Sequence, residues 1–185
     1  MGKIYYIWAC PAVLIPFIML YMKQHIISAL VENRAGTLSR VAGLFSRRGY
    51  NIDSLTVGET LDSSISRMTI AVSGDDAILE QIVKQIAKLE DVIAVRELAH
   101  DSCLRREILL VKVKANEKSR QGVIEIAGIF RSRIVDVSNT TITIEATGDM
   151  DKLNGLILLL KPYGIMELAR TGLVSLERGT LVLNP

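Results

Sequence analysis

Hydrophobic and polar residues follow two similar series of short segments, and each segment has the spacing typical of a strand or a helix. In the first series, residues 25–31 form an apolar run with the length of a buried strand, and residues 32–36 form a turn. Apolar residues then recur at helical spacing from Leu38 to Phe45, and Gly49 ends this helix. The first series therefore begins with a strand and an amphipathic helix.

The first series continues with two strands, a second helix and a closing strand. Alternation of apolar and polar residues is clearest in the second of these strands, and Asp75 or Asp76 caps the second helix. The predicted order is βαββαβ. The predicted segments are the strand 52–57, the polar turn 59–64, the strand 65–72, the helix 78–89 and the strand 92–98.

The second half of the chain repeats this order, which indicates an internal duplication. Residues 41–48 (VAGLFSRR) match residues 126–133 (IAGIFRSR), 85 positions further along, at four identical residues. Residues 100–106 form a polar linker between the copies, and residues 170–185 form a tail. The second copy is predicted as the strand 107–113, the helix 123–130, the hairpin strands 134–137 and 141–146, the helix capped by Asp149 and ended by Pro162, and the strand 165–168.

These elements predict an α+β fold of two tandem ferredoxin-like βαββαβ units. Each unit places both helices on one face of its sheet, so the other face must be covered or polar. Units of this kind often extend a sheet edge with a second copy, and we therefore expect a homodimer. The expected divisions are an apolar extension at 1–21, a first unit at 22–99, a linker at 100–106 and a second unit with its tail at 107–185.

An uncharged segment stands at the start of the chain. Residues 4–22 contain no charged side chain and have a lysine on each side, so their length is sufficient for a membrane anchor or a secretory signal. Pro11 and Pro16 interrupt a helix there, and no small-residue cleavage site follows. A translation start at Met22 is a third interpretation. We expect a cytoplasmic protein, with membrane attachment through this segment less favoured.

Composition excludes several classes of function. Lys and Arg number 22 and Asp and Glu number 20, so the chain lacks the charge of a strongly basic nucleic-acid binder. Two cysteines exclude a disulfide-rich scaffold and a four-cysteine zinc site. We interpret Cys103 as an ordinary thiol, and His25 and His100 as structural or surface residues. Dinucleotide, phosphate-loop, zinc-protease and CxxC motifs are missing from the sequence, so we expect no catalytic or metal site.

One group of residues suits a small ligand. Gly36 allows a tight turn with close approach of the backbone, and the helix that begins near Thr37 offers N–H groups to a carboxylate. Asn33 lies in the same turn, and the Asn51 amide provides a donor and an acceptor. Together they suit the ammonium and carboxylate groups of a free amino acid. The alternative is that Asn33 and Gly36 only form the turn and that Asn51 only begins a strand.

The duplication limits this ligand to the first copy. At the same 85-residue distance the second copy keeps the core pattern but changes the candidate residues, so a ligand is expected in the first copy alone. The changed pairs are Asn33 with Lys118, Gly36 with Gln121 and Asn51 with Asp136.

Several motifs carry a family resemblance. Residues 32–41 (ENRAGTLSRV) resemble the signature of the ACT domain, a regulatory amino-acid-binding module. The whole of residues 22–179 resembles the regulatory small subunit of acetolactate synthase, also called acetohydroxyacid synthase. The motifs that carry this second resemblance are 44–60 (LFSRRGYNIDSLTVGET), 66–70 (SRMTI), 105–113 (RREILLVKV), 130–138 (FRSRIVDVS) and 168–179 (LARTGLVSLERG).

The resemblance implies a non-catalytic subunit that activates the large subunit and confers feedback inhibition by a branched-chain amino acid, usually valine. The large subunit of that family uses thiamine diphosphate, magnesium and FAD, and the small subunit itself holds no cofactor. The effector of the family lies between paired N-terminal ACT domains. By motif position, its contacts in this chain are Asn33, Ala35, Gly36, Thr37, Leu38 and Asn51.

Two alternative classes of function are less favoured by the residues. A stand-alone amino-acid sensor that regulates transcription requires a DNA-binding element, and a small ferredoxin-like enzyme requires a catalytic constellation, and the sequence shows neither. A membrane-tethered form depends on the start of the mature chain. The pattern does not separate valine from leucine or isoleucine.

Overall fold

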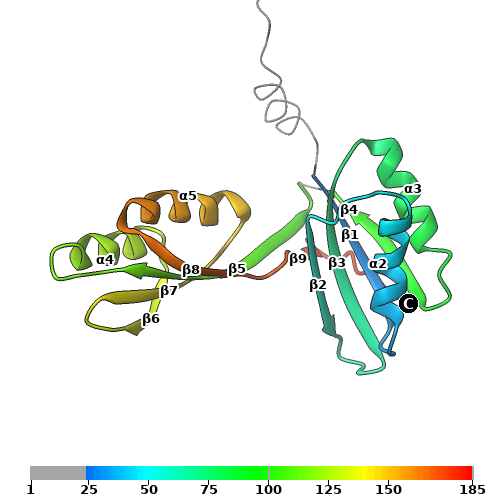
Figure 1. Cartoon of the computed structure of the whole chain (residues 1–185). Helices are drawn as coiled ribbons and strands as arrows, with labels where there is room; N and C mark the ends of the chain where they lie inside the picture. Colours follow the sequence, from blue (N-terminus) through cyan, green and yellow to red (C-terminus); the bar gives the residue numbers. More distant parts are fainter. Residues whose placement is uncertain (1–23, 100, 185) are drawn as a thin grey trace, which may run out of the picture.

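Two antiparallel sheets, each with two helices packed on one face, make up the described protein (Figure 1). The structure is a computed structural model that describes residues 24–99 and 101–184. The predicted extension at 1–21, the uncharged segment 4–22, the Met22 start and His100 lie outside the described residues. The first unit consists of β1 (Gln24–Glu32), α2 (Thr37–Arg47), β2 (Ser54–Glu59), β3 (Ile65–Ser73), α3 (Asp76–Ile86) and β4 (Val92–Leu98).

The first sheet has the strand order β2-β3-β1-β4, and every pair in it is antiparallel. β1 lies inside the sheet and contacts both β3 and β4, with Ile27 opposite Ile70 on β3. This order places the two crossover helices on the same face, as the βαββαβ pattern predicts. The α+β ferredoxin-like fold expected for this half is confirmed.

The second unit repeats the topology. Its sheet has the order β6-β7-β5-β8, with Val111 on β5 opposite Ile144 on β7. The short strand β9 pairs with β5 outside this path. The second unit consists of β5 (Cys103–Lys114), α4 (Arg120–Ile129), β6 (Arg133–Val137), β7 (Thr141–Gly148), α5 (Met150–Leu160), the 3₁₀ turn η1 (Lys161–Tyr163), β8 (Ile165–Arg170) and β9 (Val174–Glu177).

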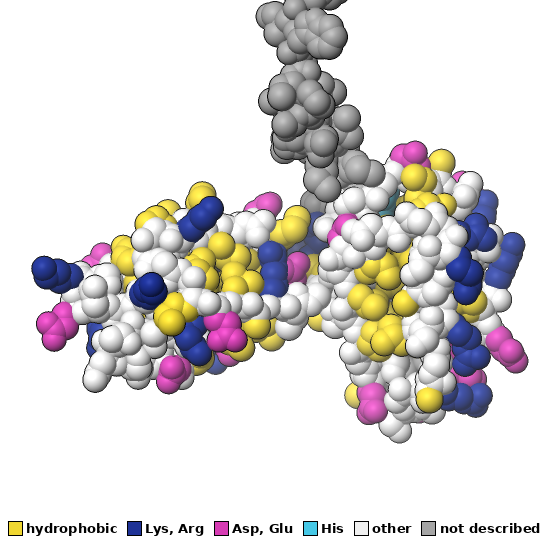
Figure 2. All heavy atoms as spheres, viewed as in Figure 1, with side chains coloured by type: hydrophobic (Ala, Val, Ile, Leu, Met, Phe, Trp, Pro, Cys, Tyr) yellow, Lys and Arg dark blue, Asp and Glu magenta, His cyan; other side chains and the backbone are white. Residues whose placement is uncertain are grey.

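Each unit has its own hydrophobic core between its sheet and its helices. Alternate residues of a strand point to the same face, so every second residue of β1 and β3 meets the apolar side of α2 and α3. The second core has the same construction from β5, β7, α4 and α5. The outer faces of α2 and α3 carry exposed charged residues, and Figure 2 shows Lys and Arg side chains along this side of the first unit. The main core residues are Ile27, Phe45, Met68, Ile70, Ile82 and Ile86 in the first unit, and Leu109, Val111, Ile142, Ile144, Leu153 and Leu156 in the second.

The spacing between the copies decreases along the chain. The helices α2 and α4 begin 83 residues apart, whereas β2 and β6 begin 79 apart and β4 and β8 begin 73 apart. The connections of the second copy are shorter, and none of these starts is 85 residues apart. The N-cap residues of α2 and α4 are Gly36 and Ser119, so the predicted pairing of Gly36 with Gln121 is wrong. The predicted pairing of Asn51 with Asp136 is therefore wrong, because Asn51 precedes β2 whereas Asp136 lies within β6.

The predicted linker and tail differ most from the structure. β5 begins at Cys103 rather than at residue 107, so residues 103–106 of the expected linker belong to a strand. β9 forms from the expected tail and pairs antiparallel with those same residues. The Ser175 hydroxyl supports this pairing by donating to the Leu104 carbonyl at 2.8 Å. The two strands form a ribbon that joins the units, and we call residues 103–106 and 174–177 the connecting ribbon.

The sheet face opposite the helices is buried in the first unit and largely exposed in the second. In the first unit, Ile26 and Leu98 lie on the face away from the helices and are buried with Cys103 and Leu173 from the connecting region. In the second unit, the open face carries the exposed side chains of Thr147 and Leu110, together with an ion pair at 3.5 Å. That ion pair joins Lys112 on β5 to Glu167 on β8. Chain from the far end of the sequence thus covers the first face, and water solvates much of the second.

Ile70 provides a test of the first core. Its side chain is 0% exposed at the centre of β3, so Ile70→Ala removes buried contacts and leaves a cavity. We expect the first unit to lose about 2–5 kcal/mol of unfolding free energy, measured by urea denaturation. Leu61→Ala is the matched control because Leu61 is fully exposed in the β2–β3 turn, and it should stay within about 0.5 kcal/mol of the parent. Equal effects of the two substitutions would contradict this core assignment.

Candidate functional site

The turn between β1 and α2 presents the uncovered start of a helix. Gly36 is the N-cap residue and has a φ of 93°, a left-handed conformation that side chains disfavour. Among the described residues, no side chain donates or accepts a capping hydrogen bond at this end, and the first turn of α2 contains no acidic residue. The Thr37 N–H already donates to the Arg34 carbonyl at 3.3 Å, so the N–H groups that follow it and the positive end of the helix dipole are the ones available to an anion.

Thr37 and Leu38 occupy the first turn of α2 in different environments. Thr37 is only 2% exposed, and its Oγ1 has no hydrogen-bond partner among residues 24–99 and 101–184. A buried hydroxyl without a partner costs free energy, which is unusual in a stable fold. Leu38 is 44% exposed, so its predicted place in the apolar face of the helix is wrong, and Thr37 takes that place. Leu38 is instead an apolar surface residue beside the turn.

Asn33 ties the β1–α2 turn to the β2–β3 turn. Its Nδ2 donates to the Ser63 carbonyl at 2.9 Å and to Glu59 Oε1 at 3.2 Å, and its backbone N–H donates to the Ser64 carbonyl at 2.7 Å. In the β2–β3 turn, hydrogen bonds from the Ser64 hydroxyl and N–H hold the pKa of Asp62 below its ordinary value. The Asn33 amide nitrogen is thus engaged within the chain by the β2–β3 turn.

Asn51 lies at the other end of the sheet. It is exposed just before β2, where its Nδ2 donates to Asp53 Oδ1 at 3.2 Å. Along β2, Ser54 is aligned with the beginning of β1, whereas Glu59 is aligned with the end of β1 that leads to Asn33. The five residue-to-residue steps from Ser54 to Glu59 span about 17 Å. The structure therefore groups Asn33, Ala35, Gly36, Thr37 and Leu38 in one turn and leaves Asn51 apart from them within a single chain.

The other polar candidates have structural surroundings. His25 is buried, with Nδ1 3.1 Å from Glu97 Oε1 and Nε2 3.2 Å from the Gly74 carbonyl. Cys103 is buried in the connecting ribbon. Within the described ranges, no group of three His, Cys, Asp or Glu side chains is placed to hold a metal ion. No helix in the described part of the chain is long and apolar enough to cross a bilayer.

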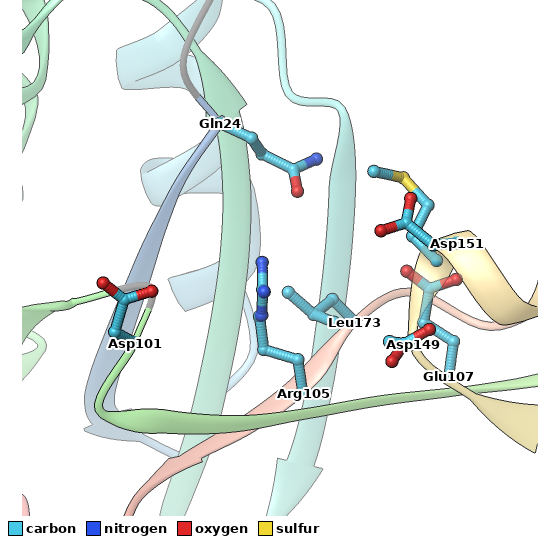
Figure 3. Close-up of a pocket in the computed structure, with 8 residues that line it drawn as sticks. Gln24, Asp101, Arg105, Glu107, Asp149, Asp151 and Leu173 are labelled. Atoms are coloured by element: carbon cyan, nitrogen blue, oxygen red, sulfur yellow. The ribbon is translucent and has the colours of Figure 1, made fainter.

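A cavity of about 550 Å³, which the sequence pattern does not predict, lies between the units (Figure 3). Several of its acidic residues have partners in the fold: Glu107 forms an ion pair with Arg170, and Asp149 accepts the Lys152 N–H as the cap of α5. The cavity forms where segments far apart in sequence meet, so local spacing gives no sign of it. Its lining residues are Gln24, Asp101, Arg105, Glu107, Asp149, Met150, Asp151 and Leu173.

Comparison with known proteins agrees with this architecture. The family described as "Small subunit of acetolactate synthase" matches residues 106–179, and "AHAS small subunit-like ACT domain" matches residues 27–94. A probable acetolactate synthase small subunit from Methanothermobacter thermautotrophicus is 53% identical over 157 residues, which cover 84% of this chain and 94% of that relative. The acetolactate synthase small subunit of Mycolicibacterium smegmatis is 50% identical over 155 residues, covering 84% of this chain and 91% of the relative.

A solved structure shows the same likeness across both units. The crystal structure of the acetolactate synthase small subunit from Thermotoga maritima has a TM-score of 0.81 and 40% sequence identity, and the match covers 86% of this chain and 100% of that one. The resemblance predicted from the motifs is confirmed at the level of the family. The chain belongs to the family of acetolactate synthase small subunits.

Proposed function

We propose that this chain is a regulatory subunit that activates a catalytic acetolactate synthase large subunit and makes it sensitive to valine, in branched-chain amino-acid biosynthesis. The observation that carries the proposal is the uncapped N-terminus of α2, which lies beside the buried, unpartnered Thr37 hydroxyl. The family supplies the partner, because its members are named as small subunits of a synthase. The thiamine diphosphate, magnesium and FAD chemistry belongs to that partner.

The turn offers complementary groups to a free amino acid. The ligand carboxylate accepts hydrogen bonds from the first N–H groups of α2, which Gly36 leaves accessible because it has no side chain. The Thr37 hydroxyl is covered in the free chain; once the ligand displaces the groups that cover it, the hydroxyl donates to the same carboxylate and gains the partner that it lacks. The Asn33 Oδ1 accepts from the ligand ammonium, because the Asn33 nitrogen already donates to the β2–β3 turn. Ala35 and Leu38 contact the aliphatic side chain.

The position of Asn51 supports a site shared by two copies. Among the described strands, β2 pairs only with β3, so its outer edge is available to another strand. Antiparallel pairing of two β2 strands about a two-fold axis places the beginning of one beside the end of the other. Asn51 of the second copy then lies beside the Asn33 turn of the first. Two equivalent sites result, each built from both chains.

Regulation follows from a difference in affinity. Valine shifts the small subunit only if it binds one arrangement more tightly than another. A ligand that bridges two copies favours the arrangement in which the turn and Asn51 are correctly spaced, and that arrangement does not support the active large subunit. A coupling of about 1–3 kcal/mol produces a 5- to 150-fold change in affinity. Calorimetric titration of the chain with valine, leucine and isoleucine measures their relative affinities.

Gly36→Asp tests the turn. The new carboxylate lies where the ligand carboxylate binds and repels it, so we expect valine inhibition of the reconstituted holoenzyme to be lost while activation of the large subunit is retained. Gly49→Asp is the control, because Gly49 also has a positive φ, at 70°, and ends the same helix. The control should remain sensitive to valine. Normal inhibition of the Gly36→Asp holoenzyme would refute the assignment of this turn.

A mixed dimer tests whether each site uses both chains. Homodimers of Gly36→Asp and of Asn51→Ala should bind no valine by calorimetry. In the heterodimer of these two chains, one site has both defects and the other has none, so we expect one valine per dimer. The control heterodimer pairs the parent chain with the Gly36→Asp, Asn51→Ala double variant, which leaves one defect in each site, and it should bind none. Equal binding by both heterodimers would exclude a site shared between chains.

A further inference from the structure

The chain that leads from the second unit crosses directly over the edge strand β2. A Cβ added to Gly172 would lie 2.7 Å from the Leu55 carbonyl oxygen and 2.4 Å from Thr56 Oγ1, so only glycine fits there without displacing the strand. The next residue, Leu173, donates its N–H to Ser54 Oγ at 2.8 Å. We call residues 171–173 the crossing segment, and its contacts fall on residues 54–56 of β2.

The crossing segment is anchored on both sides. Before it, β8 is hydrogen-bonded into the second sheet, and the Thr171 N–H donates to the Ile108 carbonyl at 3.0 Å. Within it, the Leu173 side chain is buried with Ile26, Leu98 and Cys103. The segment therefore links the second sheet, the first sheet and the connecting ribbon.

The connecting ribbon is also fixed to the first sheet. Glu177 on β9 forms an ion pair with Arg96 on β4, with Oε2 and Nη1 2.8 Å apart, and the Glu177 side chain is largely buried. Among the described residues, the chain passes between the units twice, along β5 and at the crossing segment. Figure 1 shows these two passages side by side between the lobes. The first passage continues from β4, and the second is the one that lies on β2.

We propose that the crossing segment couples effector binding at β2 to the position of the second unit. The inference rests on the proposed function, in which valine binds between paired β2 strands. Gly172 is a positioning residue: its backbone lies against the Leu55 carbonyl and the Thr56 hydroxyl of β2, so a displacement of β2 must move the segment or open this contact. Because the segment continues into β8 and β9, its movement changes the orientation of the second sheet relative to the first.

The test uses Gly172→Ala in the full chain, reconstituted with the large subunit and with valine as the probe. The methyl group separates the crossing segment from β2 and does not touch the effector turn. Valine binding is measured by calorimetry, and activation and inhibition are measured by activity. Hydrogen exchange of residues 165–177 with and without valine reports directly on coupling. Gly128→Ala is the control, because a Cβ there meets nothing within 4 Å.

The expected result is a separation of binding from response. Gly172→Ala should bind valine with an affinity close to that of the parent and still activate, whereas the valine concentration for half inhibition rises about tenfold or more, within the usual range of allosteric coupling. The valine-dependent change in hydrogen exchange at 165–177 should disappear in Gly172→Ala and persist in Gly128→Ala. A structural defect alone would not separate binding from inhibition in this way.

Two results would overturn the inference while leaving the proposed function intact. One is parental inhibition by valine in Gly172→Ala, and the other is loss of valine binding itself, which would place Gly172 in the effector site. A parent chain that binds no valine, alone or with the large subunit, would remove the proposed function and this inference together. If Gly172→Ala does not fold, Glu177→Gln weakens the ribbon's ion pair with Arg96 and is judged by the same criteria.

Discussion

In each sheet of this protein, helices cover one face only. Whether the opposite face is buried by other chain or exposed to water determines much of the remaining structure. In the first unit that face carries apolar residues such as Ile26 and Leu98, and their exposure to water would destabilise the fold. Chain from the second unit covers them through Leu173 and Cys103. In the second unit the same face carries the exposed Thr147 and the Lys112–Glu167 ion pair, which water can solvate. The asymmetry ties the second unit to the first.

The same asymmetry makes β2 a strand with two roles. Its edge is available for a second copy, and its face supports the crossing segment through Ser54 and the backbone of Leu55. A ligand that acts at the edge thus acts on a strand whose face already contacts the other unit. This arrangement gives a physical route from a small effector to a change between units, since close-packed contacts do not deform continuously.

The two copies have diverged at the turn between the first strand and the first helix. The first copy has Gly36 at the start of α2, with no side-chain cap among the described residues. The second copy also has no side-chain cap at its N-cap residue Ser119, but there the Asn116 side chain accepts from the N–H groups of Lys118 and Ser119 just before α4. The carboxylate of a ligand would compete with Asn116 there. The two turns thus differ in the side chain beside the helix start rather than in the cap itself.

Local patterns in the sequence determined the elements, the repeated βαββαβ order and the grouping of Asn33 with Gly36, because periodicity and turn residues report the chain's immediate surroundings. They did not determine that β9 pairs with residues 103–106, because four alternating residues are too short a signal and the pairing joins segments about 70 positions apart. They also wrongly predicted that Leu38 faces the core, because a shift of one residue along the helix decides whether Thr37 or Leu38 does so. The separation of Asn51 from Asn33 depends on the strand order β2-β3-β1 and its register, which are set by packing between distant segments.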